Sequence, residues 1–435
     1  MVQESVSMLL PNGIRLTIIP TAKFKTISMA LFIHQELAAE KATFTALLPS
    51  VLERGSRQYP DNLTLRRELE QLYGAELTTG VHKKGERHLI SCSLEMMHGK
   101  YVGEGEQMLR RGLSILGGVI GDPLVVNGGF KEEYVVQEKE QLEKTIRSLI
   151  NDKALYAVER CLQEMCAEER YGVFKYGRIE DLEKIDPASL WRYYRELLST
   201  NPMELYIVGD LDAKQAEEVA RETLYFSRGP QRNNLPETAV YVEPAEARFI
   251  QEKMPVGQAK LVLGYRTNIA YDDPLYFPLV LYNGILGGFP HSKLFLNVRE
   301  KASLAYYVYS RLEKQKGIML IAAGIEGNKY EMAREIIESQ VEAMARGQIS
   351  ELELENSRRG LINRLRVQED NPYQHINRHL DGEVGGKKYS TAEMIRALEE
   401  VGLNDIKAVA EKIGLDTVYL LQGEEGVLPD VRQEQ

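Results

Sequence analysis

The residues best suited to do chemistry lie in one segment of the second half of the chain. It begins at Asn283 and reads Asn-Gly-Ile-Leu-Gly-Gly-Phe-Pro-His-Ser-Lys-Leu-Phe-Leu-Asn-Val-Arg-Glu-Lys-Ala-Ser-Leu-Ala-Tyr. Its Gly287-Gly288 pair predicts a turn at which the backbone can approach another group closely. A short helix is then expected to carry Arg299, and the following strand Tyr306. Arginine offers planar donors for a peptide carbonyl or a carboxylate, and tyrosine offers a hydroxyl donor, so these residues could bind a peptide.

Arg299 and Tyr306 also have a purely structural interpretation, as an exposed helix arginine and a half-buried strand tyrosine. Spacing alone favours that interpretation. The glycines do not form a phosphate-binding loop, because the order Gly-x-x-x-x-Gly-Lys-Ser/Thr is absent.

A second set of candidate residues is histidine-based. His375 and His379 have the i, i+4 spacing that could place two zinc ligands on one helix face, and Glu383 continues that face. No glutamate base neighbours them, so the favoured interpretation is a pair of surface or capping histidines. His82 and His88 flank a Lys-Lys-Gly-Glu turn and are predicted to be exposed loop residues.

The elements that must position these residues occur twice along the chain. The first half predicts strands at 13–19 and 27–33, helices at 44–53 and 63–72, strands at 75–81 and 88–94, and a long helix at 105–116. The second half repeats this order with a strand at 259–265, helices at 274–286 and 292–299, strands at 304–310 and 317–325, and a helix at 330–344. Each half ends in an apolar strand that follows a helix, at 204–210 and 417–424.

Strands mixed with helices, without strict β-α-β alternation, indicate antiparallel sheets with helices packed on a face. The predicted fold class is therefore α+β, with two homologous domains, each a mostly antiparallel β-sheet packed with α-helices. A polar segment rich in Gly and Pro follows residue 226 and predicts a linker. The predicted domains are residues 1–228 and 243–435, joined by a linker at 229–242.

Composition excludes several functional classes. The 435 residues are 43% hydrophobic, which is enough for two domain cores, and the formal net charge of -10 argues against a nucleic-acid-binding or polybasic membrane-binding surface. The three cysteines, Cys92, Cys161 and Cys166, are predicted to be packing residues, and so sparse a set indicates reduced thiols. Neither a signal peptide nor a run of about 18 apolar residues is visible, so a cytoplasmic location is expected.

The segment from Gly287 to Tyr306 resembles the second-domain signature of the insulinase/pitrilysin family of zinc peptidases. The shared features are the Gly-Gly turn, Ser-x-Leu-Phe, Val-Arg-Glu-Lys and Leu-Ala-Tyr. The resemblance extends over almost the whole chain and includes the stretch Leu10-Pro-Asn-Gly-Ile-Arg-Leu. It implies an insulinase or mitochondrial-processing-peptidase-like fold, in which Arg299 and Tyr306 bind the substrate backbone near the scissile bond. Gly287 and Gly288 would also line the substrate site.

Active members of that family carry His-x-x-Glu-His, whose histidines hold zinc and whose glutamate activates water, a fixed distance before a Gly-Thr/Ser-x-x-Tyr-Pro turn. Here the turn is Gly55-Ser-Arg-Gln-Tyr-Pro. Counting back places the histidine positions at Ala46 and Ser50 and the base position at Pro49. The third-ligand position falls on Thr145. These side chains are poor or impossible zinc ligands, so no metal is expected in this chain.

In some bacterial members, and in the mitochondrial processing peptidase, one chain holds zinc and a second lines the chamber. The resemblance thus implies a non-zinc subunit of a heterodimeric metallopeptidase, inactive alone. It would enclose and orient a peptide or leader segment for a zinc-bearing homologous partner. Arg299 and Tyr306 would stabilise the developing oxyanion. The alternative is a catalytically inert peptide-binding or structural member. A self-sufficient hydrolase is disfavoured, because neither a Gly-x-Ser-x-Gly elbow nor a Cys/His pairing is evident.

Overall fold

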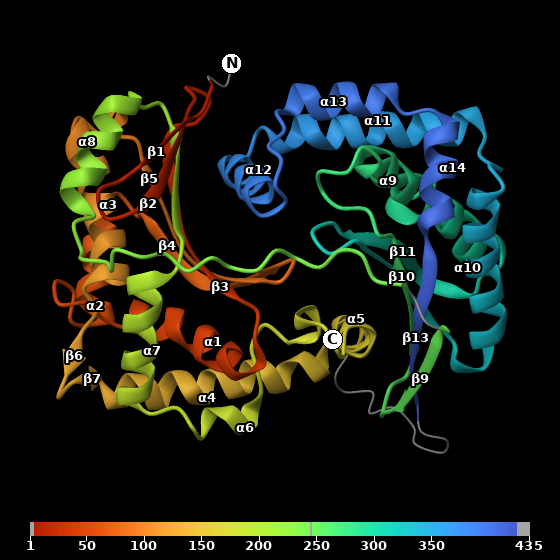
Figure 1. Ribbon diagram of the computed structural model, residues 1–435, viewed down its shortest axis with the longest axis horizontal. Coiled ribbons are helices and arrows are strands. Elements are labelled where there is room, and N and C mark those ends of the chain that lie inside the picture. The colour runs from red at the N-terminus through yellow and green to blue at the C-terminus, as the bar shows by residue number, and fades with distance from the viewer. Residues whose placement is uncertain (1–3, 244–245, 424–435) are drawn as a thin grey trace. The chain divides into compact units, whose positions relative to one another are not determined.

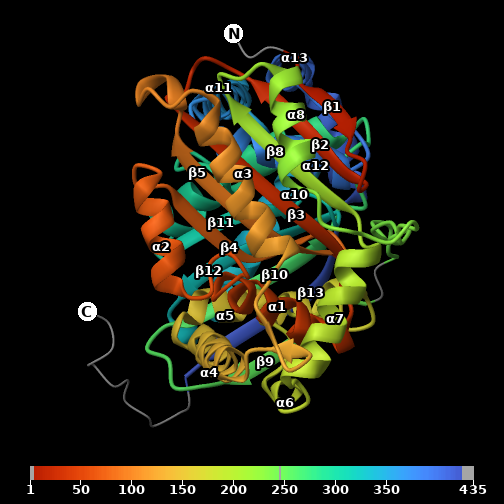
Figure 2. The same cartoon turned by 90° about the vertical axis from the view of Figure 1, so that its left-hand side faces the viewer.

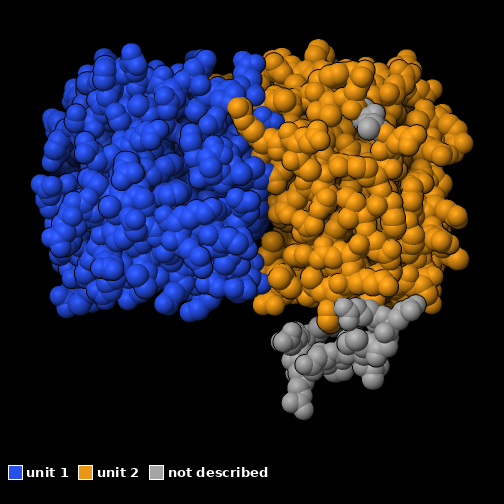
Figure 3. Space-filling model, turned by 60° about the horizontal axis from the view of Figure 1, so that its bottom comes forward, with its two compact units in different colours: residues 1–147, 173–237, 369–380 blue, residues 148–172, 238–368, 381–435 orange. Residues whose placement is uncertain are grey.

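The computed structural model describes residues 4–243 and 246–423, which form two compact units (Figure 3). Unit 1 comprises residues 1–147, 173–237 and 369–380, and unit 2 comprises residues 148–172, 238–368 and 381–435. The expected single division at 229–242 lies close to one crossing between the units. The structure differs in two segments. Residues 148–172, from the first half of the chain, belong to unit 2, and residues 369–380, from the second half, belong to unit 1.

Six strands form the main sheet of unit 1 in the order β1-β2-β8-β3-β5-β4, so β1 and β4 are its edge strands. Neighbouring strands are antiparallel except for β2 and β8, which are parallel. The strands are β1 (Val6–Leu9), β2 (Ile14–Pro20), β3 (Thr26–Glu36), β4 (Glu76–Lys84), β5 (Arg87–Met97) and β8 (Met203–Gly209), with a separate small pair β6 (Val125–Val126) and β7 (Gly129–Phe130).

Helices cover one face of this sheet, as Figure 2 shows for α3 and α8 in front of the strands. The helices of unit 1 are α1 (Ala39–Glu53), α2 (Asn62–Gln71), α3 (Glu106–Gly121), α4 (Glu132–Ser148), α6 (Ile179–Leu182), α7 (Pro187–Thr200), α8 (Ala213–Thr223) and the first part of α12 (Pro372–Val384). Local signals set several starts. The Asp186 side chain accepts from Ser189 N, and Pro187 occupies the first helical turn of α7.

The alternation of side chains along the strands decides which face is covered. In β3, Ile27, Met29 and Leu31 belong to the apolar core, whereas Ser28 and His34 lie on the opposite face. The same alternation along β5 and β8 makes the second face of the sheet polar. A sheet packed on one face and polar on the other is typical of antiparallel pairing.

Unit 2 repeats five of these six strands, and β1 has no counterpart among its described strands. Its sheet has the order β11-β12-β10-β13-β9, with the parallel pair again at the position of β13 and β9. The strands are β9 (Arg248–Lys253), β10 (Ala259–Arg266), β11 (Ala305–Glu313), β12 (Ile318–Ile325) and β13 (Gly414–Gln422). When the two sheets are read from β4 and from β11, the strands follow in the same chain order, and the same neighbours are antiparallel or parallel. The predicted fold class, two homologous α+β domains, is confirmed.

The sheet of unit 2 packs against apolar side chains on both of its faces. One face packs on α9 (Tyr276–Asn283), α10 (Tyr330–Ala345), α11 (Glu351–Gln368), α13 (Thr391–Glu400) and α14 (Leu403–Lys412) (Figure 1). The other face packs on α5 (Lys153–Met165), which brings Cys161 and Leu162 against Val262 and Tyr419. All three cysteines are buried and none is in a disulfide, as expected for packing residues.

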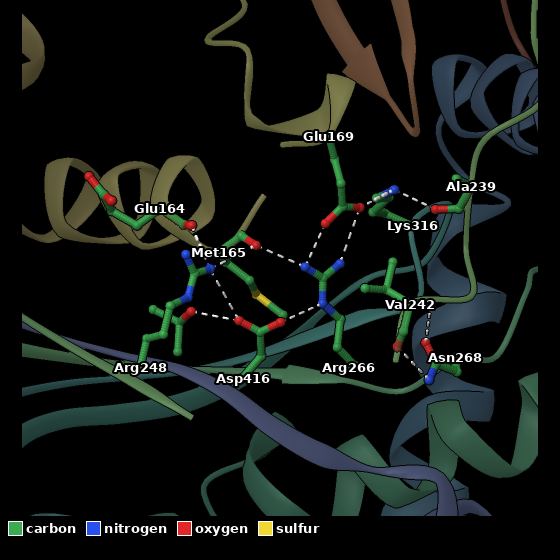
Figure 4. Close-up of polar contacts among 11 residues, drawn as sticks. Glu164, Met165, Glu169, Ala239, Val242, Arg248, Arg266, Asn268, Lys316 and Asp416 are labelled. Atoms are coloured by element: carbon green, nitrogen blue, oxygen red, sulfur yellow. Dashed lines mark hydrogen bonds and ion pairs between the residues drawn. The ribbon is translucent and has the colours of Figure 1, made fainter. Parts of the chain in front are cut away.

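A buried ion network fastens the segment after α5 to unit 2 (Figure 4). Arg266, only 1% exposed, donates from Nε to Asp416 Oδ2 at 2.8 Å and from Nη2 to Glu169 Oε1 at 2.6 Å. Lys316 Nζ lies 2.6 Å from Glu169 Oε2. Burial lowers the pKa of Arg266, but the hydrogen bonds to Glu169 and Asp416 outweigh it and raise the pKa overall. Arg248 Nη2 also lies 3.6 Å from Asp416 Oδ1, so three cations surround the two carboxylates and compensate their charges.

Candidate functional site

The four positions expected to have lost zinc ligands lie around one cavity in unit 1. Ala46, Pro49 and Ser50 reach it from α1, and Thr145 reaches it from α4. The cavity has a volume of about 190 Å³. Its other walls come from the middle of β4, from α4 and from Tyr176. The positions found by counting along the sequence are therefore neighbours in space.

The donors around this cavity do not fit zinc. Among its described lining residues, Glu138 alone carries a group that zinc prefers, and its Oε1 accepts from Arg54 Nε at 2.5 Å. The Thr145 hydroxyl donates to the Gln141 carbonyl at 2.9 Å. Across residues 4–243 and 246–423, no three His, Cys, Asp or Glu side chains gather as a metal site would need. This chain's own residues supply no zinc-dependent step here.

Arg299 lies on an unusual helix in unit 2. Residues Phe295–Lys301 form a π-helix that follows a first π-helical turn at Gly284–Gly288. Such turns are rare and occur often at functional sites. The Arg299 guanidinium lies 4.7 Å from the centre of the Phe295 ring, and its side chain is 43% exposed. It is thus held by an aromatic neighbour yet remains accessible.

Tyr306 occupies the start of β11, the edge strand of the sheet in unit 2. Its side chain is 64% exposed, whereas the purely structural interpretation expected a half-buried tyrosine. The π-helix that carries Arg299 contacts the same strand. The structure therefore places both residues on adjoining elements, and both side chains reach solvent within the unit.

Packing explains the glycine turn. A Cβ atom at Gly287 would lie 2.5 Å from Ser310 N and 2.6 Å from Ser310 Oγ. The close approach that Gly287 permits is therefore to β11. Gly288 is half-buried, and its carbonyl accepts from Arg364 at 3.4 Å. A contact of either glycine with substrate stays a prediction.

The histidine pair on α12 forms no metal site. His375 is buried, which corrects its interpretation as a surface group, and its Nε2 lies 3.0 Å from the Glu369 carbonyl. Burial lowers the pKa of His375. The His379 ring lies 6.3 Å from that of Tyr206. The His375 ring meets the Phe24 ring edge-on at 5.9 Å, so both histidines make ring contacts within unit 1.

The expectation of exposed loop histidines at positions 82 and 88 is wrong. Both residues lie in strands, His82 in β4 and His88 in β5. His88 is fully buried, and burial lowers its pKa to about 3, so the ring is neutral at pH 7. Of the two, only His82 is exposed, and its Nε2 lies 3.0 Å from Ser91 Oγ.

The sequence interpretation missed a groove of about 690 Å³ along β4 in unit 1. Its floor is the polar face of the sheet, and Tyr373 and Asn377 of α12 form part of its wall. The signal was present in β4, where polar side chains alternate at Glu76, Thr78 and His82. This alternation predicts a half-buried strand, but only the tertiary structure shows that β4 is an edge strand of the sheet.

Comparison with known proteins gives the family and the fold. Residues 184–361 match the family described as "Peptidase M16 inactive domain". A Bacillus subtilis (strain 168) protein described as probable inactive metalloprotease YmfF is 35% identical over 415 residues, which cover 95% of this chain and 97% of that protein. The crystal structure of a conserved protein from Enterococcus faecalis V583 superposes with a TM-score of 0.90 at 30% identity, covering 98% of this chain and all of that one.

A peptidase M16 inactive domain from Pseudomonas fluorescens gives a TM-score of 0.78 at 17% identity, with 98% of this chain and 100% of that chain covered, and so shares the fold. The chain belongs to the M16 peptidase family, the insulinase/pitrilysin-type family that its motifs resemble. It is an inactive, metallopeptidase-like member, because the residues around the cavity do not fit zinc. In the described part of the chain no helix is long and apolar enough to cross a bilayer.

Proposed function

We propose that this chain is the non-zinc subunit of a two-chain metallopeptidase, and that it binds and orients a peptide for a zinc-bearing homologous partner. One asymmetry carries the proposal. The unit 1 cavity has no ligand set for zinc, while Arg299 and Tyr306 of unit 2 remain exposed on adjoining elements.

The role of each side chain follows from its donors. Arg299 would bind a peptide carbonyl through its planar guanidinium, and Tyr306 would donate its hydroxyl to the oxygen on which negative charge develops. The partner would supply the metal and the hydrolytic step. This chain's contribution is orientation, because two donors fixed on one unit restrict how the peptide backbone can lie.

The test is reconstitution with a zinc-motif relative that co-purifies from the native cell. The purified chain alone should not cleave a peptide library, and the pair should. Arg299→Ala should lower kcat by a factor on the order of 10². Arg346→Ala is the matched control, since Arg346 is an exposed arginine at the end of a helix in the same unit. Full peptidase activity of the lone chain would refute the proposal.

A second candidate function is an inert peptide-binding or structural protein. The groove along β4 favours it, because a peptide could bind there without help from Arg299 or Tyr306. The double variant Arg299→Ala/Tyr306→Phe separates the two functions. Unchanged turnover by the reconstituted pair would favour the inert role, whereas a large loss supports the proposed subunit.

A further inference from the structure

One edge of the sheet in unit 2 lacks the strand that covers the corresponding edge in unit 1. In unit 1, β1 pairs antiparallel with the outer side of β2. Strand β9 is the counterpart of β2, because each of them pairs in parallel with its inner neighbour. Among the described strands, β9 pairs with β13 alone, so it ends the sheet (Figure 1). Its outer side therefore presents a row of backbone donors and acceptors.

The backbone of β9 is regular. Its residues, Arg248–Lys253, include no proline, and their register with β13 continues without a shift. By contrast, the register of the opposite edge strand, β11, shifts between Ala305 and Tyr307, as at a β-bulge that hinders pairing at an edge. The Phe249 side chain is also 47% exposed, with its ring 5.6 Å from that of Tyr330. A regular edge with an exposed aromatic side chain is suited to accept another strand.

The charges of β9 decide which strand pairs with it best. Arg248 and Glu252 lie on the face that α5 covers, as does Ile250 between them. The two charged side chains are 48% and 28% exposed, so both can be reached at the edge. Burial raises the pKa of Glu252, but hydrogen bonds from two tyrosine hydroxyls lower it by more, so this carboxylate is charged at neutral pH. The best partner strand therefore carries a negative charge opposite Arg248 and a positive charge opposite Glu252.

A second copy of β9 meets this requirement. Residues directly opposite each other in an antiparallel pair point to the same face, so a two-fold pair of β9 strands must be centred on one residue. If that residue is Ile250, Arg248 of each copy lies opposite Glu252 of the other. Centring the pair on Phe249 or Gln251 would set a charged residue opposite Ile250. Centring it on Arg248 or Glu252 would oppose like charges, which is destabilising.

We propose that β9 is a dimerisation edge, at which two copies of this chain pair their β9 strands antiparallel about Ile250 and join the two unit 2 sheets into one. Such an interface is self-complementary and closes after two copies, as in most homo-oligomers. Because one short strand pair buries less surface than a standard interface, the dimer should form only at micromolar or higher concentration. The dimer goes beyond the proposed function, since β9 carries neither Arg299 nor Tyr306.

The lone, full-length chain is tested without a zinc-bearing partner or a substrate, so failure to dimerise and failure of the reconstitution are separate results. Sedimentation equilibrium should show the average mass rising from one chain toward two between about 1 and 100 μM. Arg248→Glu sets like charges opposite each other at two positions and should weaken the dimer at least several-fold. Arg346→Glu, the same charge change at an exposed position of unit 2, should dimerise as the wild type does. A wild type that stays monomeric would overturn the dimer, and so would equal dimerisation of all three proteins.

Cysteine cross-linking tests the register. Ile250→Cys places two thiols opposite each other, so oxidised glutathione should convert the chain to a disulfide-linked dimer. A mixture of Phe249→Cys and Gln251→Cys, with one variant tagged to change its size, should give the mixed dimer in preference to either homodimer. Hydrogen-bonded and non-hydrogen-bonded pairs alternate along the strands, so one of these two cross-links falls at a non-hydrogen-bonded pair, where side chains are closer. The native cysteines are all buried, so they add little background.

Lys214→Cys, at an exposed position of α8, measures cross-linking by random collision. At least one of the two β9 cross-links should form several-fold faster than the Lys214→Cys dimer. If neither is faster than this control, the strand pairing is wrong, and homodimers that form as fast as the mixed dimer would overturn the register about Ile250. Circular dichroism and thermal midpoints check that each variant is folded before its association is compared.

Discussion

The guanidinium of Arg299 lies 4.7 Å from the centre of the Phe295 ring, four residues earlier on the same π-helix. A cation over an aromatic face gains about 0.5–1 kcal/mol at an exposed site. The contact therefore restricts the direction in which an otherwise mobile, exposed side chain points.

Phe295→Leu should lower turnover by the reconstituted pair by a few-fold, because it removes the aromatic face but keeps an apolar side chain. Phe295→Tyr should retain activity, since the ring remains. Steady-state kinetics on one peptide would measure both. Equal turnover by all three proteins would show that Phe295 does not position Arg299.

The four degenerate positions can be tested by rebuilding the site. Ala46→His, Ser50→His and Thr145→Glu together should create a three-ligand zinc site, because these positions line one cavity. Elemental analysis after dialysis should find about one zinc per chain in the triple variant and none in the wild type. Ala46→His alone is the control. A folded triple variant without zinc would contradict the assignment of Thr145 as the third-ligand position.

Gly287 should resist substitution for a packing reason. Gly287→Ala places a methyl group 2.5 Å from Ser310 N, so it should lower the free energy of unfolding by about 1–3 kcal/mol. Gly327→Ala is the matched control, since no heavy atom lies within 4 Å of the added carbon, and its effect should be within about 0.5 kcal/mol. Urea denaturation measures both. Similar effects for the two variants would contradict this account.

The buried network around Arg266 predicts a large loss on truncation. Arg266→Met would leave the carboxylates of Glu169 and Asp416 without their shared partner, at a cost of about 3–5 kcal/mol. Arg346→Met removes an exposed arginine paired with Glu342 at 3.2 Å and should cost less than about 1 kcal/mol. Chemical denaturation of the two variants should separate these outcomes. Equal small losses would show that the network contributes little.

Glu204 should make stability depend on pH in acid. Burial raises the pKa of this carboxyl group, but His34, whose Nε2 lies 3.4 Å away, and the Tyr206 hydroxyl at 2.6 Å lower it by more. A lowered pKa contributes stability above the unfolded value of about 4.3, and that contribution is lost as the pH falls through the folded pKa.

The free energy of unfolding of the wild type should therefore fall more steeply below about pH 4.3 than that of Glu204→Gln. Glu342→Gln, at an exposed carboxylate, should follow the wild-type curve. Denaturation midpoints between pH 3 and 7 would measure the three curves. Parallel curves for wild type and Glu204→Gln would show that the Glu204–His34 pair does not make stability depend on pH.

Much of the architecture was predictable because its signals are local. Alternation along β3 and β10 and helical periodicity at α3 and α10 are set by neighbours within a few residues. The repeated order of elements follows from them, and so does the fold class. The positions predicted to have lost zinc ligands on α1 were also accessible, because helix spacing and the turn beginning at Gly55 fix them by counting, whereas Thr145 follows from the family resemblance.

Other features required long-range packing. Glu169 follows α5 in the first half of the chain, yet its carboxylate pairs with Arg266 about a hundred residues later. No local pattern says which core an amphipathic helix will join. The burial of His88 has the same origin, since a polar residue beside a turn carries no sign that the sheet will enclose it.

The sequence by itself indicated the family and the two repeated domains, because motif spacing and periodicity are properties of neighbouring residues. It also predicted that Ala46, Pro49, Ser50 and Thr145 stand at the positions of zinc ligands and base. The tertiary structure alone decided that these positions share one cavity beside the open edge of β4, and that Arg299 rests on Phe295 while remaining exposed. Burial and edge exposure depend on which distant segments pack together, and local sequence patterns do not encode that choice.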